Sequence, residues 1–210
     1  MTSPDPRAHR RSPGTPARPP FGFRLTAPPG WEALRGDAAS LRDDLVAVVA
    51  RTPLWDELDD RRRGGLAYVL DGIARASAAT GALAVLLHLP DPADPAALTD
   101  PTALTDPAVA AITLTWFRTA PVRADLDLAR LVLGDGEPVV AGVGPALLTR
   151  RVEPQVTGGE QVTVQVAAPV PDSIWLALIT GTTTTREHQP ALEDAVRRVA
   201  AGLVTDAARS

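Results

Sequence analysis

Cysteine, lysine and asparagine are absent from this 210-residue chain, and histidine occurs only three times, at His9, His88 and His188. The lack of cysteine excludes a thiolate nucleophile, a disulfide framework and cysteine-ligated zinc or iron–sulfur sites. The lack of lysine excludes a Schiff-base amine and the lysine of a phosphate-binding P-loop. All 21 basic residues are arginines, which is typical of a GC-rich genome, so part of this composition reflects codon bias.

Long apolar runs are missing as well. The longest, residues 81–89, has the size of a strand and is far shorter than the roughly 18 residues that span a bilayer. Arginines and prolines occupy the N-terminal positions where a signal peptide would have an apolar stretch. We therefore expect a cytoplasmic protein without membrane insertion.

The charge of the chain is unevenly distributed. The formal net charge is −4, and residues 1–20 contain four arginines and one aspartate, so the remaining residues carry about −7. An acidic domain repels a phosphate backbone, and no stripe of basic and aromatic residues occurs in it. The sequence thus predicts no binding of nucleic acid.

Residues 1–20 hold six of the 21 prolines and no large apolar residue after Met1. Such a segment has nothing to bury that would offset the entropy of ordering it. We predict a disordered, Arg/Pro-rich tail over residues 1–20 and a single domain over residues 21–206.

Apolar periodicity and turn residues predict the elements of this domain. Ser40 and Asp43 resemble a capping box at the start of a helix, and Gly64-Gly65 should weaken or break the next one. Strands are expected over residues 21–26, 82–89, 112–116, 139–153 with a break at 142–145, 160–168 and 173–182, and helices over 41–50, 53–63, 66–73, 125–133 and 190–203.

The strand over residues 174–179 is apolar on both faces, so both faces must be covered. Trp175 and Leu176 should be buried toward opposite layers, whereas Gln165 should lie on an outward face. We predict the α+β class, as an α/β/α sandwich with a mainly antiparallel sheet covered by helices on both faces. A ferredoxin-like sheet with one open face is the alternative.

Catalytic motifs are not found. The domain's serines, Ser40, Ser77 and Ser173, lie in neither G-x-S-x-G nor S-x-x-K, and Asp172-Ser173 has the composition of a hairpin turn. His88 is expected to be a satisfied histidine at the rim of the core. The Gly142-x-Gly144 pattern lacks the third glycine and the helix of a dinucleotide loop. We predict no enzyme, no cofactor and no metal site.

Two sets of charged residues could still form a site. Arg118, Arg150 and Arg151 stand at strand ends and could together bind a carboxylate or an acidic peptide. The long loop over residues 91–107 has the only dense supply of carboxylates, at Asp91, Asp94, Asp100 and Asp106. Loops of this length are often functional, so a hydrolase that uses these carboxylates is the alternative function.

A family resemblance rests on short motifs and on the order of elements. Phe21–Leu25 leads into Pro28-Pro29-Gly30-Trp31, Gly144–Arg151 precedes a Val-rich strand that ends in Ala168–Pro171, and an amphipathic helix closes the chain. This pattern resembles uncharacterised proteins of high-GC Gram-positive bacteria in the PsbP/LpqN-like α/β/α sandwich superfamily. The resemblance implies a non-catalytic adaptor or chaperone-like domain that binds another protein, and it assigns no functional residue. LpqN-type members carry a lipoprotein signal, which is not found here.

Overall fold

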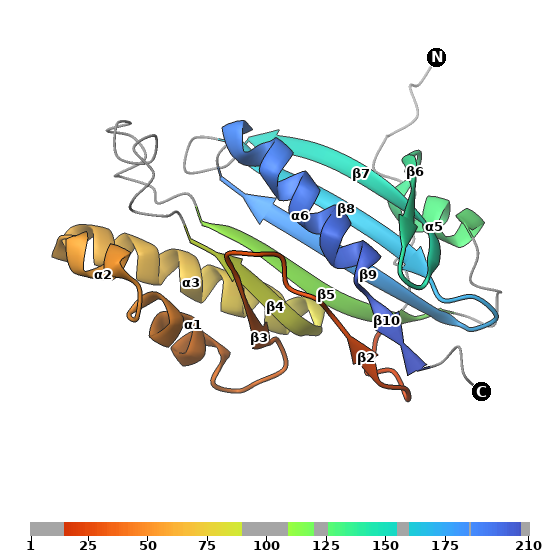
Figure 1. Ribbon diagram of the computed structural model, residues 1–210, viewed down its shortest axis with the longest axis horizontal. Coiled ribbons are helices and arrows are strands. Elements are labelled where there is room, and N and C mark those ends of the chain that lie inside the picture. The colour runs from red at the N-terminus through yellow and green to blue at the C-terminus, as the bar shows by residue number, and fades with distance from the viewer. Residues whose placement is uncertain (1–14, 90–108, 120–125, 155–159, 185, 207–210) are drawn as a thin grey trace, which may run out of the picture.

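The computed structural model describes residues 15–89, 109–119, 126–154, 160–184 and 186–206. Figure 1 shows the long C-terminal helix lying across a broad sheet. In chain order the elements are β1 (Thr15–Pro16), β2 (Phe23–Arg24), β3 (Trp31–Arg35), α1 (Leu41–Val49), α2 (Pro53–Glu57), α3 (Asp60–Thr80), β4 (Ala82–His88), β5 (Ala110–Arg118), α5 (Leu126–Leu133), β6 (Glu137–Ala141), β7 (Gly144–Pro154), β8 (Glu160–Pro169), β9 (Trp175–Thr183), the 3-10 helix η1 (Arg186–His188), α6 (Gln189–Ala201) and β10 (Val204–Thr205).

The main sheet has the strand order β3-β4-β5-β9-β8-β7-β6, and β1 pairs with the end of β5. Every strand pair among the described residues is antiparallel. The predicted α+β class and the mainly antiparallel sheet are thus confirmed. Strand β9, whose first five residues are apolar on both faces, lies in the middle of the order, where a strand with two apolar faces must lie.

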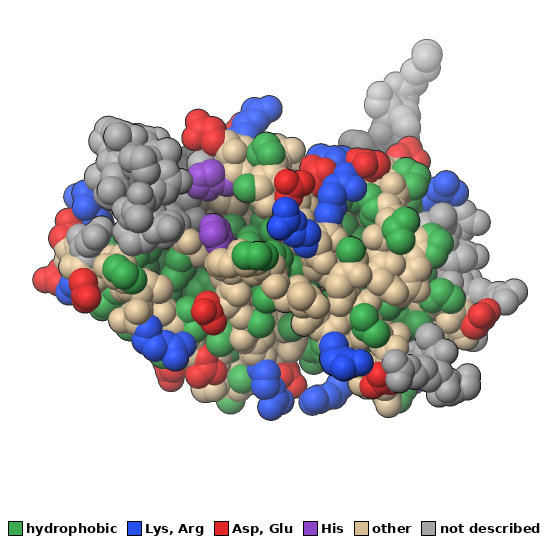
Figure 2. Space-filling model, viewed as in Figure 1, with side chains coloured by type: hydrophobic (Ala, Val, Ile, Leu, Met, Phe, Trp, Pro, Cys, Tyr) green, Lys and Arg blue, Asp and Glu red, His purple; other side chains and the backbone are tan. Residues whose placement is uncertain are grey.

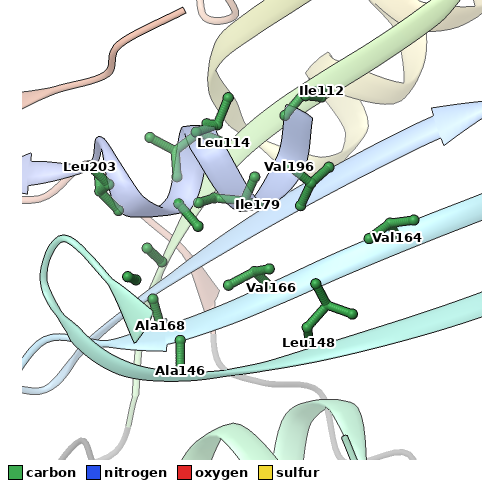
Figure 3. Packing of buried hydrophobic residues seen from close by; sticks show 14 of the residues in the cluster. Ile112, Leu114, Ala146, Leu148, Val164, Val166, Ala168, Ile179, Val196 and Leu203 are labelled. Carbon is green, nitrogen blue, oxygen red and sulfur yellow. The ribbon is translucent and has the colours of Figure 1, made fainter. Parts of the chain in front are cut away.

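Helix α6 packs on one face of this sheet. Alternate residues of β7, β8 and β9, including Leu148, Val166 and Ile179, form one buried cluster with Val196 and Leu203 of the C-terminal segment (Figure 3). The helix packs closely at Gly181, where a Cβ atom would lie 2.5 Å from Val196 Cγ2. A larger residue there would push α6 away from β9, so this glycine sets the distance between helix and sheet.

The other helices join separate clusters. Val85 and Leu87 of β4 pack with the buried residues of α1 and α3, whereas Leu86 between them belongs to the α6 cluster. Because successive side chains of a strand point to opposite faces, α1 and α3 lie on the face opposite α6. Leu176 of β9 lies on that same face, in a third cluster with Leu133 of α5.

Between these two clusters the second face is polar. Threonines of β5, β8 and β9 and Gln165 lie there, and most of them are half-buried. These side chains belong to neither of the two apolar clusters on this face. Complete helical covering of both faces is therefore not confirmed.

Local signals explain where the helices begin and end. Helix α3 runs through Gly64-Gly65, and the break lies instead at Leu58-Asp59, because the Asp59 side chain caps the new helix by accepting from Arg62 N at 2.8 Å. The predicted break at the glycines is thus wrong. Ser40 does not cap α1 with its side chain, since its hydroxyl donates to Asp44 Oδ2.

The N-terminal boundary also differs from the prediction. Residues 15–20, assigned to the disordered tail, are ordered on the sheet: Ala17 N donates to Trp116 O at 3.0 Å, and Pro19 is buried. Their extended backbone pairs without needing apolar bulk, which composition could not reveal. The rest of the predicted tail and the 91–107 loop lie outside the described residues.

Candidate functional site

A pocket forms where residues 18–25 cross the sheet near its β3 edge. Along this segment Phe21, Phe23 and Leu25 are partly buried and alternate with exposed residues. Phe21 packs edge-to-face on Trp116 at 5.3 Å between ring centroids. Two-residue β2 pairs with β10, so only this short part of the predicted strand 21–26 forms a ladder.

The pocket has a volume of about 410 Å³, which is within the range of ligand sites. Most of its lining is apolar. The lining residues are Arg18, Pro19, Phe21, Gly22, Phe23, Leu25, Ala33, Leu34, Arg35, Asp37, Leu83, Ala84 and Leu86.

Charged side chains among the lining residues form a small ion-pair group. Asp37 Oδ2 lies 3.2 Å from Arg18 Nη1, and Asp37 Oδ1 lies 3.4 Å from Arg35 Nε. Both arginines are about three-quarters exposed, so these pairs contribute little stability. Because two guanidinium groups face one carboxylate, these three side chains carry a net charge of +1.

The backbone of β3 beside the pocket is open on its outer side. Gly36 N donates to Leu83 O of the neighbouring β4 segment, whereas Trp31 N donates to Pro28 O. Since the backbone groups of alternate residues point to the same side of a strand, those of Ala33 point away from β4. Ala33 N–H and C=O have no backbone partner in the part of the chain that the structure describes. Sequence reasoning missed this strand, because its residues do not alternate.

His88 is the last residue of β4, the strand that pairs with the edge strand β3. Its ring stacks on Trp31 at 5.2 Å between centroids, and its Nδ1 lies 3.0 Å from the carbonyl oxygen of Gly30, to which it donates. The ring is thus held in place by a carbonyl and an indole, as expected for a satisfied histidine at the rim.

The three predicted arginines do not form one site. Arg151 aligns through Thr163 and Thr182 with Ala111 of β5. Arg118 is seven residues further along β5, which is roughly 23 Å at the rise of an antiparallel strand. Arg150 and Arg151 are sequence neighbours on one strand, so their side chains point to opposite faces.

Arg150 instead belongs to an ion-pair network that ties α6 to β6 and β7. Its guanidinium bonds both Glu193 and Glu137, and Arg197 bonds the same two carboxylates, with Nη2 2.8 Å from Glu137 Oε1. The hydrogen bonds from Arg150 have the largest effect, and together with those from Arg197 they hold the pKa values of Glu137 and Glu193 below their usual value. Figure 2 shows blue and red side chains adjoining over this region. Arg150 is therefore not free to bind a ligand anion.

The remaining candidates have structural roles or lie outside the described residues. Ser173 Oγ donates to Val170 O at 2.8 Å and accepts from Trp175 N, as a hairpin-turn serine does. Gly142 belongs to the β6–β7 turn, where its N–H donates to Ala200 O. The loop carboxylates Asp91, Asp94, Asp100 and Asp106 lie outside the described residues.

The residues that the structure describes form neither a cluster of metal ligands nor a membrane-spanning helix. No three histidine, aspartate or glutamate side chains in these ranges gather closely enough to hold a metal ion. None of the described helices combines the length and the apolar character needed to cross a membrane.

Comparison with solved structures shows a distant structural similarity. LpqN of Mycobacterium tuberculosis is a structural neighbour of this chain. Its crystal structure is described as that of a protein involved in cell envelope biogenesis. The match covers 94% of this chain and 88% of LpqN at 13% sequence identity, with a TM-score of 0.44. No family model and no curated protein matches the chain. At this similarity we take no functional conclusion from LpqN.

Proposed function

We propose that this chain is a non-catalytic domain that binds another protein by taking up an extended segment of it along β3. The free edge of β3 directly beside an apolar pocket is the observation that carries the proposal. An exposed edge offers backbone hydrogen bonds to a partner strand, and a neighbouring pocket selects one of its side chains.

The groups around β3 and the pocket define what such a partner segment needs. Ala33 supplies one outward N–H and one outward C=O, so the segment must be extended there. The phenylalanine and leucine side chains of the pocket favour an apolar residue. Arg18 and Arg35 outnumber Asp37, so an acidic residue next to the apolar one would add charge complementarity.

The absence of catalysis is part of this proposal. The titratable side chains that line the pocket are Arg18, Arg35 and Asp37, and the only carboxylate is paired with both arginines. A pocket of this kind suits binding better than acid–base chemistry, which needs groups poised to exchange a proton.

A selection experiment tests the proposal. The full chain is used to select linear peptides from a phage library, and the enriched peptides are synthesised and their affinities measured by titration. We expect extended apolar peptides with a neighbouring acidic residue. Ala33→Pro removes the outward N–H, and Ala84→Leu narrows the pocket, so each should weaken binding at least about tenfold.

Ala33→Ser is the matched control, because it keeps the backbone N–H and should bind like the wild type. Far-UV circular dichroism and the thermal midpoint of each variant show that the fold is retained. Failure to enrich any peptide, or equal binding by the Ala33→Pro variant, would contradict the proposal.

A further inference from the structure

The sheet face opposite α6 carries an ordered row of polar side chains. Thr113 pairs in register with Thr180, Thr180 with Gln165, and Gln165 with Thr149. The row therefore crosses β5, β9, β8 and β7, with neighbouring side chains about 4.8 Å apart in the direction across the strands. Thr113, Thr180 and Gln165 are half-buried, so part of each side chain is accessible.

Hydrogen bonds hold part of this row in place. Gln165 Nε2 donates to Thr180 Oγ1 at 3.2 Å, and Thr113 Oγ1 donates to Thr180 O at 3.4 Å. A glutamine amide has two donors and a carbonyl acceptor, and each hydroxyl can both donate and accept. The row therefore presents fixed polar groups with unused hydrogen-bonding capacity.

One buried hydroxyl group of the row has no partner among the described residues. It is Thr149 Oγ1, which ends the row on β7. A buried hydroxyl without a partner is unfavourable, and such a group calls for an explanation such as a bound polar molecule.

The next row adds one cation. Thr182 pairs with Thr163, and Thr163 with Arg151, whose side chain has no ion-pair partner in the described ranges. One row further out, Glu153 of β7 lies on the same face. The two charges cancel formally, so the surface is close to neutral and dominated by hydroxyl and amide groups.

We infer that this face binds a neutral, hydroxyl-rich ligand, and that the ligand is an oligosaccharide. Hydroxyl groups repeat along a sugar chain and both donate and accept, which matches a repeating row of threonine and glutamine groups. Guanidinium donors of Arg151 can bond a pair of sugar oxygens. An apolar peptide would leave these polar groups unsatisfied, and a polyanion would find one arginine beside a glutamate.

This site is independent of the β3 edge. Leu86 and Ala84, which line the pocket, belong to or pack against the α6 cluster, whereas the polar row lies on the opposite face. Loss of one activity should therefore leave the other intact.

The test uses the full chain on an array of neutral linear and branched oligosaccharides, with affinities of bound glycans then measured by calorimetry. We expect at least one neutral oligosaccharide to bind. Thr180→Val and Gln165→Leu should each weaken that binding about tenfold or more, because each removes hydrogen bonds while keeping a similar shape. Thr180→Ser, which retains the hydroxyl, should retain binding.

Thr26→Val is the matched control, since Thr26 is exposed beside the end of α6. In amide NMR spectra the glycan should shift the side-chain resonances of Gln165, identified by their loss in Gln165→Leu. The inference is overturned if no neutral glycan binds, if only charged glycans bind, or if Thr180→Val and Gln165→Leu bind like the wild type.

Discussion

Replacing Trp175 and Leu176 singly by alanine tests whether β9 packs on both of its faces. These neighbours point in opposite directions. Trp175 lies in the α6 cluster with its ring 5.9 Å from that of Phe21, and Leu176 is fully buried with residues of α5 and β7. Each substitution should therefore remove buried contacts on one face only.

The expected loss of stability follows from the buried groups. Leu176→Ala removes three carbon groups at about 0.8 kcal/mol each, roughly 2.5 kcal/mol of transfer free energy. Incomplete collapse of the space left behind adds about 1–2 kcal/mol, so we expect about 4 kcal/mol. Trp175→Ala should lower the free energy of unfolding by about 3–5 kcal/mol.

Gln165→Ala is the control on the polar row. Its outward position alone predicts a loss within about 0.5 kcal/mol. In the structure the Gln165 side chain donates a hydrogen bond to Thr180, so we expect a loss of stability of about 1 kcal/mol. The assay is guanidinium unfolding followed by far-UV circular dichroism, which does not depend on the tryptophan that is removed. If only one of the two apolar substitutions proved costly, packing on both faces of β9 would be refuted.

Two further predictions concern the ion-pair network and the N-terminal segment. Because the pKa values of Glu137 and Glu193 are lowered in the folded state, the network stabilises the protein above about pH 4.5, and this stability is lost as the pH falls through the lowered values. The difference in urea midpoint between wild type and Arg150→Gln should therefore be constant near neutral pH and vanish in acid; a difference that grew in acid would contradict this. Deleting residues 1–20 should lower stability by about 1–2 kcal/mol, because Ala17 and Pro19 pack on the sheet, whereas deleting residues 1–14 should change it little. Equal thermal midpoints of the two truncations would show that residues 15–20 contribute nothing.

The elements that sequence reasoning found share strong periodicity or clear boundary residues. The α6 stripe of Leu192, Val196 and Val199 is buried as expected, and Gly81 ends α3 in the left-handed conformation. The strand over 174–179 was predicted to be central from its two apolar faces, and β9 is central.

The missed features depend on partners distant in the chain. β3 is half exposed and is defined by its ladder with β4, more than forty residues away along the chain, and no local pattern reports that pairing. The ordering of residues 15–20 likewise comes from β5.

The candidate site was predicted poorly for the same reason. Arg118, Arg150 and Arg151 were grouped because all were expected at strand ends, but Arg150 and Arg151 lie within β7, and the register of four strands places Arg118 far from them. The pocket could be anticipated in part, since Phe21, Phe23 and Leu25 alternate, yet the surface they face is set by tertiary packing.

The strand order also has a consequence for the kinetics of folding. β6, β7, β8 and β9 pair in chain order, and α6 follows directly, so this part of the sheet can assemble through contacts between sequence neighbours. The β5–β9 ladder instead joins residues 57 to 73 positions apart, as in the pairs Arg118–Trp175 and Ala110–Thr183. We therefore expect the N-terminal half of the sheet to dock on β9 late in folding, and substitutions in β9 to slow folding more than substitutions in β3 do.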